Sequence, residues 1–241
     1  MNLIVPDWPA PTRVKSLMTM RTGGVSQAPW TSFNLGDHVG DDAAHVAANR
    51  ARLRRRLPAE PVWLRQVHGV RAVELGHEPA PEADAAFTRE PGRVCAVLTA
   101  DCLPVLFCDR AGSIVAAAHA GWRGLAGGVL EATVAAMQVS PEDLLVWLGA
   151  AIGPHAFEVG EAVRETFVAR HPEAADAFLP HPAATGKWLA DLYRLARIRL
   201  NRLGVHAVYG GGRCTFNEPD NFYSYRRDGV TGRMASLVWL V

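Results

Sequence analysis

The chain has 241 residues, of which 49% are hydrophobic and 20% are charged, which is an ordinary globular composition. Its 25 basic and 24 acidic residues leave a formal net charge of +1, so no overall field draws nucleic acid or an anionic membrane to it. We find neither a secretory signal pattern nor a run of about 18 apolar residues, and we expect a cytoplasmic monomer or small homo-oligomer without nucleic-acid or membrane partners.

The predicted elements follow one another without a repeat or a long linker, so we expect one domain over residues 1–241. Loops are predicted over 6–12 and 77–87, and the basic run at 49–57 predicts a helix with a solvated face. Apolar periodicity predicts strands over 62–75, 93–99, 103–109, 113–119, 144–152, 205–211 and 234–241, and helices over 125–139 and 187–204. This mixture of hairpins and helices favours an α+β fold with mixed sheets over a doubly wound nucleotide-binding fold.

The four cysteines show no C-x-x-C spacing: Cys95, Cys102, Cys108 and Cys214. Cys95 and Cys108 fall in apolar strand-like runs, which predicts buried, reduced thiols rather than a disulfide framework. Cys214 follows a glycine run that allows close approach of the backbone. A place beside a functional site is therefore one interpretation of Cys214.

The stretch TADCLPVLF places Asp101 and Cys102 where an apolar strand begins. Burying a charge without a partner is costly. The two side chains therefore either have partners there or lie at an open strand end.

The turn CDRAGS (108–113) joins two predicted strands into a hairpin. A loop formed by residues 110–111 or 109–112 would pair residues whose numbers sum to 221. That register places Cys102 directly opposite His119, with Cβ atoms about 4.5–5.5 Å apart. An odd-length loop or a bulge would break this pairing.

Two further motifs supply candidate functional side chains. In AGWRG (120–124), a strand end and a helix N-terminus predict an anion pocket in which Arg123 binds phosphate or carboxylate. The alternative is a plain connection with Trp122 packed beneath it. In RQVHG (65–69), His68 ends a strand pattern, and His, Cys and His together would give zinc three ligands and leave one position open.

Several motifs, in order over nearly the whole chain, resemble those of the YfiH-type laccase-domain family, which is also named purine nucleoside phosphorylase or multicopper polyphenol oxidase. These motifs are RTGGVSQAPWTSFNLGDHVGDD, RQVHG, TADCLPVLF, AHAGWRG, IGPHAFEVG, GGRCT and FYSYRRDGVTGR. The resemblance implies a His–Cys–His metal set on His68, Cys102 and His119, with zinc as the metal and copper as the alternative. It also implies a layered α/β sandwich comparable to a deamidase toxin of the cysteine-hydrolase type.

The activities implied by the resemblance are phosphorolysis of adenosine, inosine, guanosine and methylthioadenosine, and deamination of adenosine. Some bacterial members are instead linked to the editing of peptidoglycan precursors. One departure is that His155 and Ala156 stand where many members have two cysteines, so the shared chemistry does not need those thiols. His155 is either a pocket residue or a surface residue.

For a nucleoside enzyme, the partners are a purine nucleoside and phosphate. Arg123 is then the candidate phosphate ligand, Asp101 the candidate acid–base group, and Cys102 and His119 complete the candidate catalytic set. The candidate substrate contacts are Arg21, Asn34 and Arg65. The motif at 222–233 offers further pocket candidates, namely Tyr223, Arg226 and Arg227.

Three other functions stay open at this point. A copper polyphenol oxidase would use the same cluster, although oxygen reduction normally needs several coppers and more histidines than one cluster offers. A cysteine hydrolase or amidase that edits a peptidoglycan precursor would use Cys102 as nucleophile and His119 as base. A non-catalytic, metal-stabilised module is the fourth reading, and an open coordination position argues against it.

Overall fold

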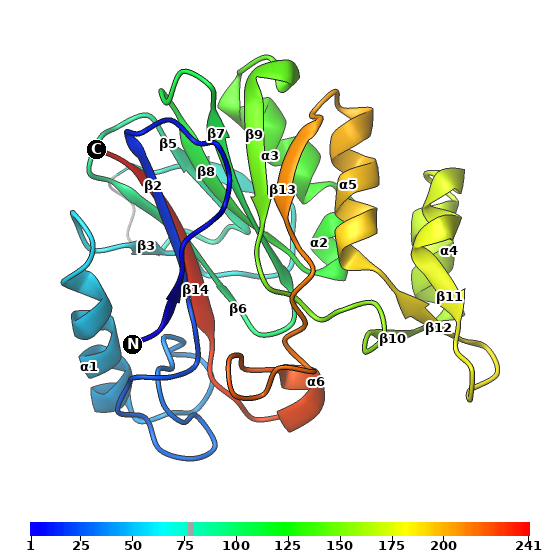
Figure 1. The fold of residues 1–241 in the computed structure, drawn as a ribbon, viewed down its shortest axis with the longest axis horizontal. Coiled ribbons are helices and arrows are strands. Elements are labelled where there is room, and N and C mark those ends of the chain that lie inside the picture. Colours follow the sequence, from blue (N-terminus) through cyan, green and yellow to red (C-terminus); the bar gives the residue numbers. More distant parts are fainter. Residues whose placement is uncertain (77–79) are drawn as a thin grey trace.

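Two mixed β-sheets form the centre of the computed structural model, which describes residues 1–76 and 80–241 (Figure 1). The five-stranded sheet has the order β1 (Leu3–Ile4), β2 (Val14–Thr19), β14 (Met234–Leu240), β6 (Val94–Thr99) and β3 (Val62–Trp63). The six-stranded sheet has the order β13 (Ala207–Gly210), β9 (Leu144–Leu148), β7 (Leu103–Asp109), β8 (Val115–Ala120), β5 (Ala85–Thr88) and β4 (Ala72–Glu74). A small third sheet contains β10 (Glu158–Gly160), β12 (Lys187–Ala190) and β11 (Phe178–Pro180).

Helices cover the outer faces of the two large sheets (Figure 1). The α-helices are α1 (Ala43–Arg54), α2 (Trp122–Gly127), α3 (Val129–Met137), α4 (Glu161–Val168), α5 (Leu192–Arg202) and α6 (Tyr225–Asp228). Two 3-10 helices are η1 (Pro141–Asp143) and η2 (Pro172–Ala177). Among the described residues, none of these helices has the length and apolar character that crossing a bilayer requires.

Alternating side chains explain the layers. Met18, Val97 and Val238 of one sheet pack against Leu106 and Ala117 of the other, and all five are buried. Burial of such a side chain contributes about 1.5–3 kcal/mol relative to leaving it in water. Further apolar clusters lie between the six-stranded sheet and α2, α3 and α5, and between the five-stranded sheet and α1. The predicted layered α/β sandwich with mixed sheets is therefore confirmed, whereas its likeness to a deamidase toxin stays a prediction.

Several element boundaries differ from those predicted. The helix predicted over 125–139 is two helices, because the chain turns at Gly128, which has a φ of 110°. The helix predicted over 187–204 begins only after Asp191, whose side chain accepts a hydrogen bond from the Arg194 N–H and caps α5. Residues before this cap form β12 instead.

Four other predicted segments also differ from the structure. The strand predicted over 62–75 is two short strands, β3 and β4, which belong to different sheets. Residues 77–79 of the loop predicted over 77–87 lie outside the described residues, but its last part is not a surface loop: Asp84 is buried and β5 follows at once. The strand predicted over 144–152 ends at Leu148, and the basic helix ends at Arg54.

The chain passes from the five-stranded to the six-stranded sheet twice at the same end of the sandwich. One passage links β6 to β7 and carries Asp101 and Cys102, and the other links β3 to β4 and carries His68. Because β3 and β6 are parallel neighbours, both passages leave the five-stranded sheet at the same end of its strands. Asp101 and His68 have φ values of 86° and 60°, a left-handed conformation that costs energy and recurs at functional sites.

The described cysteines are all free. Cys95 and Cys108 are fully buried in the layer between the sheets. Burial raises the pKa of both thiols, to about 12 for Cys108, with Asp109 contributing there. The prediction that these two cysteines are buried core residues with free thiols is confirmed.

Candidate metal centre

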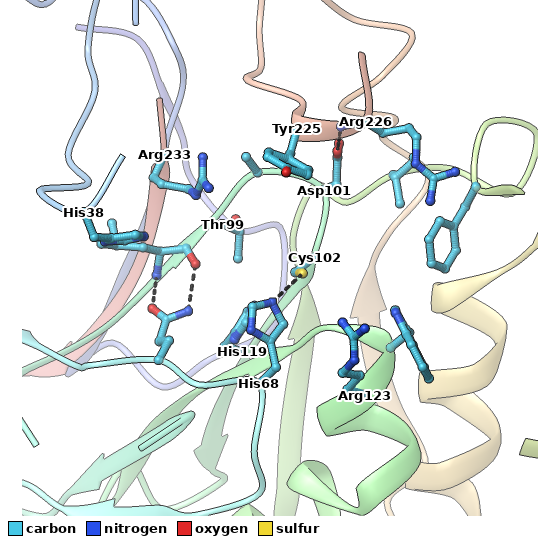
Figure 2. A pocket seen from close by; sticks show the side chains of 16 residues that line it. His38, His68, Thr99, Asp101, Cys102, His119, Arg123, Tyr225, Arg226 and Arg233 are labelled. Atoms are coloured by element: carbon cyan, nitrogen blue, oxygen red, sulfur yellow. Dashed lines mark hydrogen bonds between the residues drawn. The ribbon is translucent and has the colours of Figure 1, made fainter. Parts of the chain in front are cut away.

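The side chains of His68, Cys102 and His119 meet at this end of the sandwich (Figure 2). Their three potential ligand atoms all lie within 4.8 Å of one another. Cys102 Sγ lies 3.9 Å from His68 Nε2. The two imidazole rings are 4.7 Å apart and nearly perpendicular, at 74°. The predicted contact of the three residues is therefore present.

The hairpin register that led to this prediction was wrong in one respect. Residues paired between β7 and β8 have numbers that sum to 223, so His119 lies opposite Pro104. The loop contains residues 110–113, one residue later than expected. The pairing partner of each residue therefore changes by two positions. Because two is an even number, Cys102 stays on the same face of the sheet as His119 and becomes its diagonal neighbour, a separation that a long side chain spans.

Gly121 follows the same register and borders the thiol. A Cβ at this position would lie 2.9 Å from Cys102 Sγ and 3.1 Å from His68 Cδ2. Its φ of −61° is open to any residue. Glycine is therefore needed here for space and not for backbone conformation.

Asp84 positions two of the three candidate ligands and was not predicted from the sequence. Its carboxylate is fully buried, and Oδ1 accepts hydrogen bonds from His119 Nδ1 at 2.8 Å and from the His68 N–H at 2.9 Å. Oδ2 accepts from the N–H groups of Val67 at 3.2 Å and Gly69 at 2.6 Å. Such a partner fixes the imidazole tautomer and leaves Nε2 of His119 free to bind a metal.

The cluster perturbs its own ionisation. Burial opposes ionisation of the Cys102 thiol, but His119 and His68 beside it lower the thiol pKa to about 6. Burial works against the charged form of His119 as well, yet Cys102 and Asp84 raise its pKa to about 9. Burial would raise the pKa of Asp84, but the hydrogen bonds from His119 and the Gly69 N–H hold it below its usual value.

The donor set fits zinc or copper. Two imidazole nitrogens and a thiolate are ligands that both metals accept. Neighbouring ligand atoms on a tetrahedral zinc lie about 3.3–3.8 Å apart, given bonds of about 2.0–2.3 Å, and the 3.9 Å between Cys102 Sγ and His68 Nε2 is close to this range. Within the described ranges the chain offers one such group of three ligands. The metal identity stays a prediction.

The cluster forms the floor of a pocket of about 600 Å³, a size typical of small-molecule sites. Its walls combine apolar and cationic side chains from distant parts of the sequence (Figure 2). The residues around the cluster are His38, Gln66, Leu98, Thr99, Ala100, Asp101, Trp122, Arg123, Ile152, Phe157, Tyr225, Arg226 and Arg233. Arg233 and Tyr225 were not among the predicted site residues, although both stand in a motif that had been singled out.

Asp101 lines the pocket, but its carboxylate already has partners. Oδ1 accepts a hydrogen bond from the Thr215 hydroxyl at 2.6 Å, and Oδ2 accepts from the Arg226 N–H at 2.7 Å. These contacts connect the β6–β7 segment, which carries Asp101, to the segment between β13 and β14. They favour a positioning role for Asp101 over the acid–base role expected from the sequence.

Of the four other predicted polar contacts, one lines the pocket. Arg123 is exposed on the first turn of α2, with its guanidinium 4.6 Å from the Trp122 ring. The remaining three lie outside the lining. Arg21 donates to the Pro219 carbonyl at 2.7 Å, Asn34 is fully buried, and Arg65 forms an ion pair with Glu82 on the surface.

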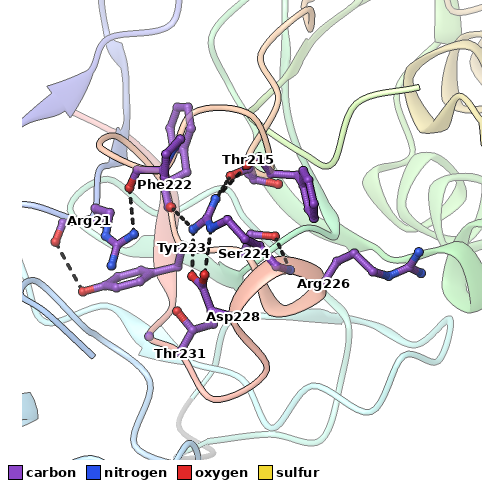
Figure 3. Close-up of polar contacts among 12 residues, drawn as sticks. Arg21, Thr215, Phe222, Tyr223, Ser224, Arg226, Asp228 and Thr231 are labelled. Carbon is purple, nitrogen blue, oxygen red and sulfur yellow. Dashed lines mark hydrogen bonds and ion pairs between the residues drawn. The ribbon is translucent and has the colours of Figure 1, made fainter. Parts of the chain in front are cut away.

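The loop before β14 is held by hydrogen bonds rather than by burial alone (Figure 3). Arg227 donates to the carbonyls of Thr215, Phe216 and Phe222 at 2.7–3.0 Å, so it faces the loop and not the pocket. The Tyr223 hydroxyl donates to the Trp30 carbonyl at 2.7 Å. Of the three candidates predicted in this motif, only Arg226 lines the pocket.

His155 and Cys214 border a separate, smaller pocket of about 240 Å³. The Cys214 thiol accepts a hydrogen bond from the Gly153 N–H at 3.2 Å. Neither residue lines the larger pocket. The structure therefore does not place Cys214 beside the metal cluster.

Comparisons with known proteins agree over the full chain. The protein family described as multi-copper polyphenol oxidoreductase laccase matches residues 15–241. The chain is 60% identical over 237 residues to a purine nucleoside phosphorylase of Pseudomonas aeruginosa, covering 98% of each chain. It is 56% identical over 244 residues to the purine nucleoside phosphorylase YfiH of Escherichia coli, covering 100% of this chain and 99% of the relative.

Solved structures show the same fold. Neisseria meningitidis protein NMB0706 is similar with a TM-score of 0.94 and 54% identity, over 100% of this chain and 99% of the other. YlmD from Geobacillus stearothermophilus is similar with a TM-score of 0.88 and 32% identity, over 96% and 93% of the two chains.

Proposed function

The chain belongs to the multi-copper polyphenol oxidoreductase laccase family, which includes the YfiH-type proteins, and we propose that it is a zinc-dependent purine nucleoside phosphorylase that also deaminates adenosine. The observation that carries this proposal is the His68–Cys102–His119 cluster on the floor of a pocket that is large enough for a small molecule. The names of the similar proteins supply the substrate class. The proposed substrates are adenosine, inosine, guanosine and methylthioadenosine.

Zinc held by His68, Cys102 and His119 would supply a Lewis acid with one open coordination position. Asp84 keeps His119 in the tautomer that presents Nε2 to the cluster. The glycine at position 121 leaves room for the thiol. These residues fix the floor of the site before substrate arrives.

The walls of the pocket suit a purine and an anion. Trp122, Phe157 and Ile152 contribute apolar surface to the pocket lining, and a flat purine ring stacks favourably on aromatic side chains. Arginine side chains also line the pocket, and a guanidinium is well suited to binding phosphate. Arg123, the arginine proposed from the sequence as the phosphate ligand, is one of them.

Phosphorolysis joins a phosphate oxygen to C1′ of the ribose while the C1′–N9 bond breaks. The electron pair of that bond stays on the purine, which leaves with a proton, and the products are the free base and ribose 1-phosphate. Deamination of adenosine replaces the C6 amino group with oxygen from water and releases ammonia. Both reactions require the bound nucleoside to be oriented and bulk water to be kept away from it.

A second candidate, a cysteine hydrolase, is favoured by one specific observation. Cys102, His119 and Asp84 have the order of a nucleophile, a base and an orienting carboxylate. The thiol pKa of about 6 and the imidazole pKa of about 9 describe a thiolate beside an imidazolium. In this candidate the substrate is an amide of a peptidoglycan precursor, and a bound metal inhibits.

A copper polyphenol oxidase ranks below both. The part of the chain that the structure describes holds one three-ligand group, whereas oxygen reduction coupled to polyphenol oxidation normally uses several coppers. The cluster alone resembles the His₂Cys set of an electron-transfer centre.

The deciding experiment incubates zinc-loaded protein with adenosine, with and without phosphate, and identifies the products by mass. We expect adenine and ribose 1-phosphate only when phosphate is present, and inosine in either case. Chelated protein should lose both activities and regain them with zinc. Activity that rises on chelation, with an amide substrate cleaved instead, would replace this proposal with the cysteine hydrolase.

A further inference from the structure

One wall of the pocket carries Arg233 and Thr99. The guanidinium of Arg233 has protein partners for only part of its N–H groups, and the Thr99 hydroxyl has none among the described residues. Arg233 stands directly before β14, and Thr99 ends β6, where it pairs with Met234 of β14. The two side chains therefore come from neighbouring positions at the ends of adjacent strands. Figure 2 shows Thr99 between Arg233 and Cys102, on the side of the pocket away from Arg123.

Arg233 is a half-buried cation for which the described residues provide no carboxylate partner. Its Nη1 donates to the carbonyls of Thr231 and Gly232, each at 3.0 Å. Nε and Nη2 make no hydrogen bond within residues 1–76 and 80–241, so the side-on edge of the guanidinium is unused. Asp101 is a nearby acidic group, but both of its oxygens are engaged elsewhere.

Burial lowers the pKa of the Arg233 guanidinium, and Cys102, Asp101 and Tyr225 offset only part of this effect. A desolvated cation without a bound anion is unfavourable. An anionic ligand in the pocket would relieve this cost.

Thr99 provides the second, independent observation. Its side chain is 1% exposed, and its Oγ1 is buried without a hydrogen-bond partner in the described residues. A buried hydroxyl without a partner is unfavourable, and most such groups are satisfied. Thr99 is one of the residues that line the pocket, so a ligand seated against this side chain would give its hydroxyl a partner.

Contacts with residues 34–36 position the backbone and the first part of the side chain of Arg233. The Asn34 side chain accepts a hydrogen bond from the Arg233 N–H at 2.9 Å, and the Leu35 N–H donates to the Arg233 carbonyl at 3.2 Å. A Cβ at Gly36 would lie 2.8 Å from Arg233 Cγ. Asn34, expected to touch substrate, is thus a positioning residue that acts through Arg233.

We infer that Arg233 and Thr99 form the phosphate subsite of this pocket, with the free edge of the guanidinium and the hydroxyl binding different oxygens of one phosphate. The inference rests on the proposed function, because phosphate is the co-substrate of phosphorolysis. A tetrahedral anion offers oxygens in several directions and suits donors that come from two strands. Arg123, the phosphate ligand expected from the sequence, is exposed and stacked on Trp122, and in this inference it contacts the nucleoside instead.

The test measures the KM for phosphate and the KM for inosine separately in zinc-loaded variants. Arg233→Gln should raise the KM for phosphate about 10- to 100-fold, as expected for lost hydrogen bonds to a charged group, and change the KM for inosine less than about 3-fold. Arg233→Lys should fall between wild type and Arg233→Gln, because lysine keeps the charge without the fork. Arg123→Gln should alter mainly the KM for inosine.

Thr99→Val separates a binding role from a structural one. Valine has the shape of threonine and removes a hydroxyl that has no partner, so the melting temperature should stay the same or rise. The KM for phosphate should nevertheless rise about 3- to 10-fold, for one lost hydrogen bond. Arg194→Gln, at an exposed arginine outside the pocket lining, is the matched control and should leave both KM values unchanged.

Calorimetric titration with inorganic phosphate distinguishes failure of this inference from failure of the proposed function. If wild-type protein binds phosphate and Arg233→Gln binds it at least about 10-fold more weakly, the subsite stands even if no nucleoside is cleaved. If Arg233→Gln and Thr99→Val bind phosphate as tightly as wild type, the inference is overturned even if phosphorolysis occurs. Absence of phosphate binding to wild type overturns it too.

Discussion

Replacing Asp84 with asparagine should weaken both the fold and the metal centre. The change preserves the shape of the side chain but removes its charge and turns one acceptor oxygen into an NH₂ donor. Oδ1 serves His119 and the His68 N–H, and Oδ2 serves the N–H groups of Val67 and Gly69. Either orientation of the amide therefore loses two of the four hydrogen bonds.

The expected magnitude follows from these contacts. Each hydrogen bond to a charged group contributes about 1.5–3 kcal/mol, and the new NH₂ faces buried donors. We expect Asp84→Asn to lower the free energy of unfolding by about 3–5 kcal/mol and the melting temperature by on the order of 10 °C. Zinc affinity should fall about 10- to 100-fold, because His119 loses the partner that orients it.

Asp109→Asn is the matched control for this prediction. Asp109 is also a buried carboxylate. It lies at the turn between β7 and β8 and accepts hydrogen bonds from the Ser113 N–H, the Ser113 hydroxyl and the Ile114 N–H. Both variants should lose stability in urea unfolding, but only Asp84→Asn should weaken zinc binding in competition with a chromophoric chelator. Equal zinc affinity in the two variants would refute the role given to Asp84.

Three further predictions concern the floor and walls of the pocket. Gly121→Ala should fold normally but bind zinc at least about 10-fold more weakly, as with other residues that support metal ligands. The reason is that the new methyl group would lie 2.9 Å from Cys102 Sγ. The same chelator competition measures the zinc affinity. In metal-free protein, the rate of Cys102 alkylation by iodoacetamide should rise with pH through about 6 and then level off, whereas an inflection near about 8.5, the ordinary thiol value, would contradict the imidazole effect. Arg227→Gln should lower the urea midpoint and raise the KM for nucleoside, because it leaves the carbonyls of Thr215, Phe216 and Phe222 unpaired under the loop that carries Tyr225; unchanged kinetics would show that this loop does not shape the pocket.

The meeting of Cys102 with His119 could be predicted because side chains alternate along a strand. The expected register was off, yet its parity was right, so both residues stayed on one face. Periodicity fixes the face of a strand more firmly than it fixes the partner, since the partner depends on the loop. The turn CDRAGS allowed several loops, and its sequence alone did not select residues 110–113.

Asp84 escaped prediction because its neighbours suggested a loop. The stretch HEPAPEADAAF is rich in proline and charge, and only its last residues enter a buried strand. A lone carboxylate before a short apolar run was nevertheless a usable signal, since the same pattern drew attention to Asp101. The partners of Asp84 come from a different strand passage, and such long-range pairing is not written in local sequence.

The roles of the polar motif residues depended on tertiary contacts in the same way. Asn34 and Arg21 have the chemistry of substrate contacts, but the fold uses both to hold backbone segments together. Arg233 follows a glycine in a motif of several arginines, and nothing in the sequence distinguishes it from Arg226 or Arg227. Only the placement of each guanidinium relative to the pocket separates them.

The most direct test of the central claim is a crystal structure of zinc-loaded protein with anomalous diffraction measured on both sides of the zinc edge. We expect one strong zinc peak within bonding distance of His68 Nε2, Cys102 Sγ and His119 Nε2, which disappears in Cys102→Ala while the fold remains. A zinc peak elsewhere, or an unchanged peak in Cys102→Ala, would contradict this claim.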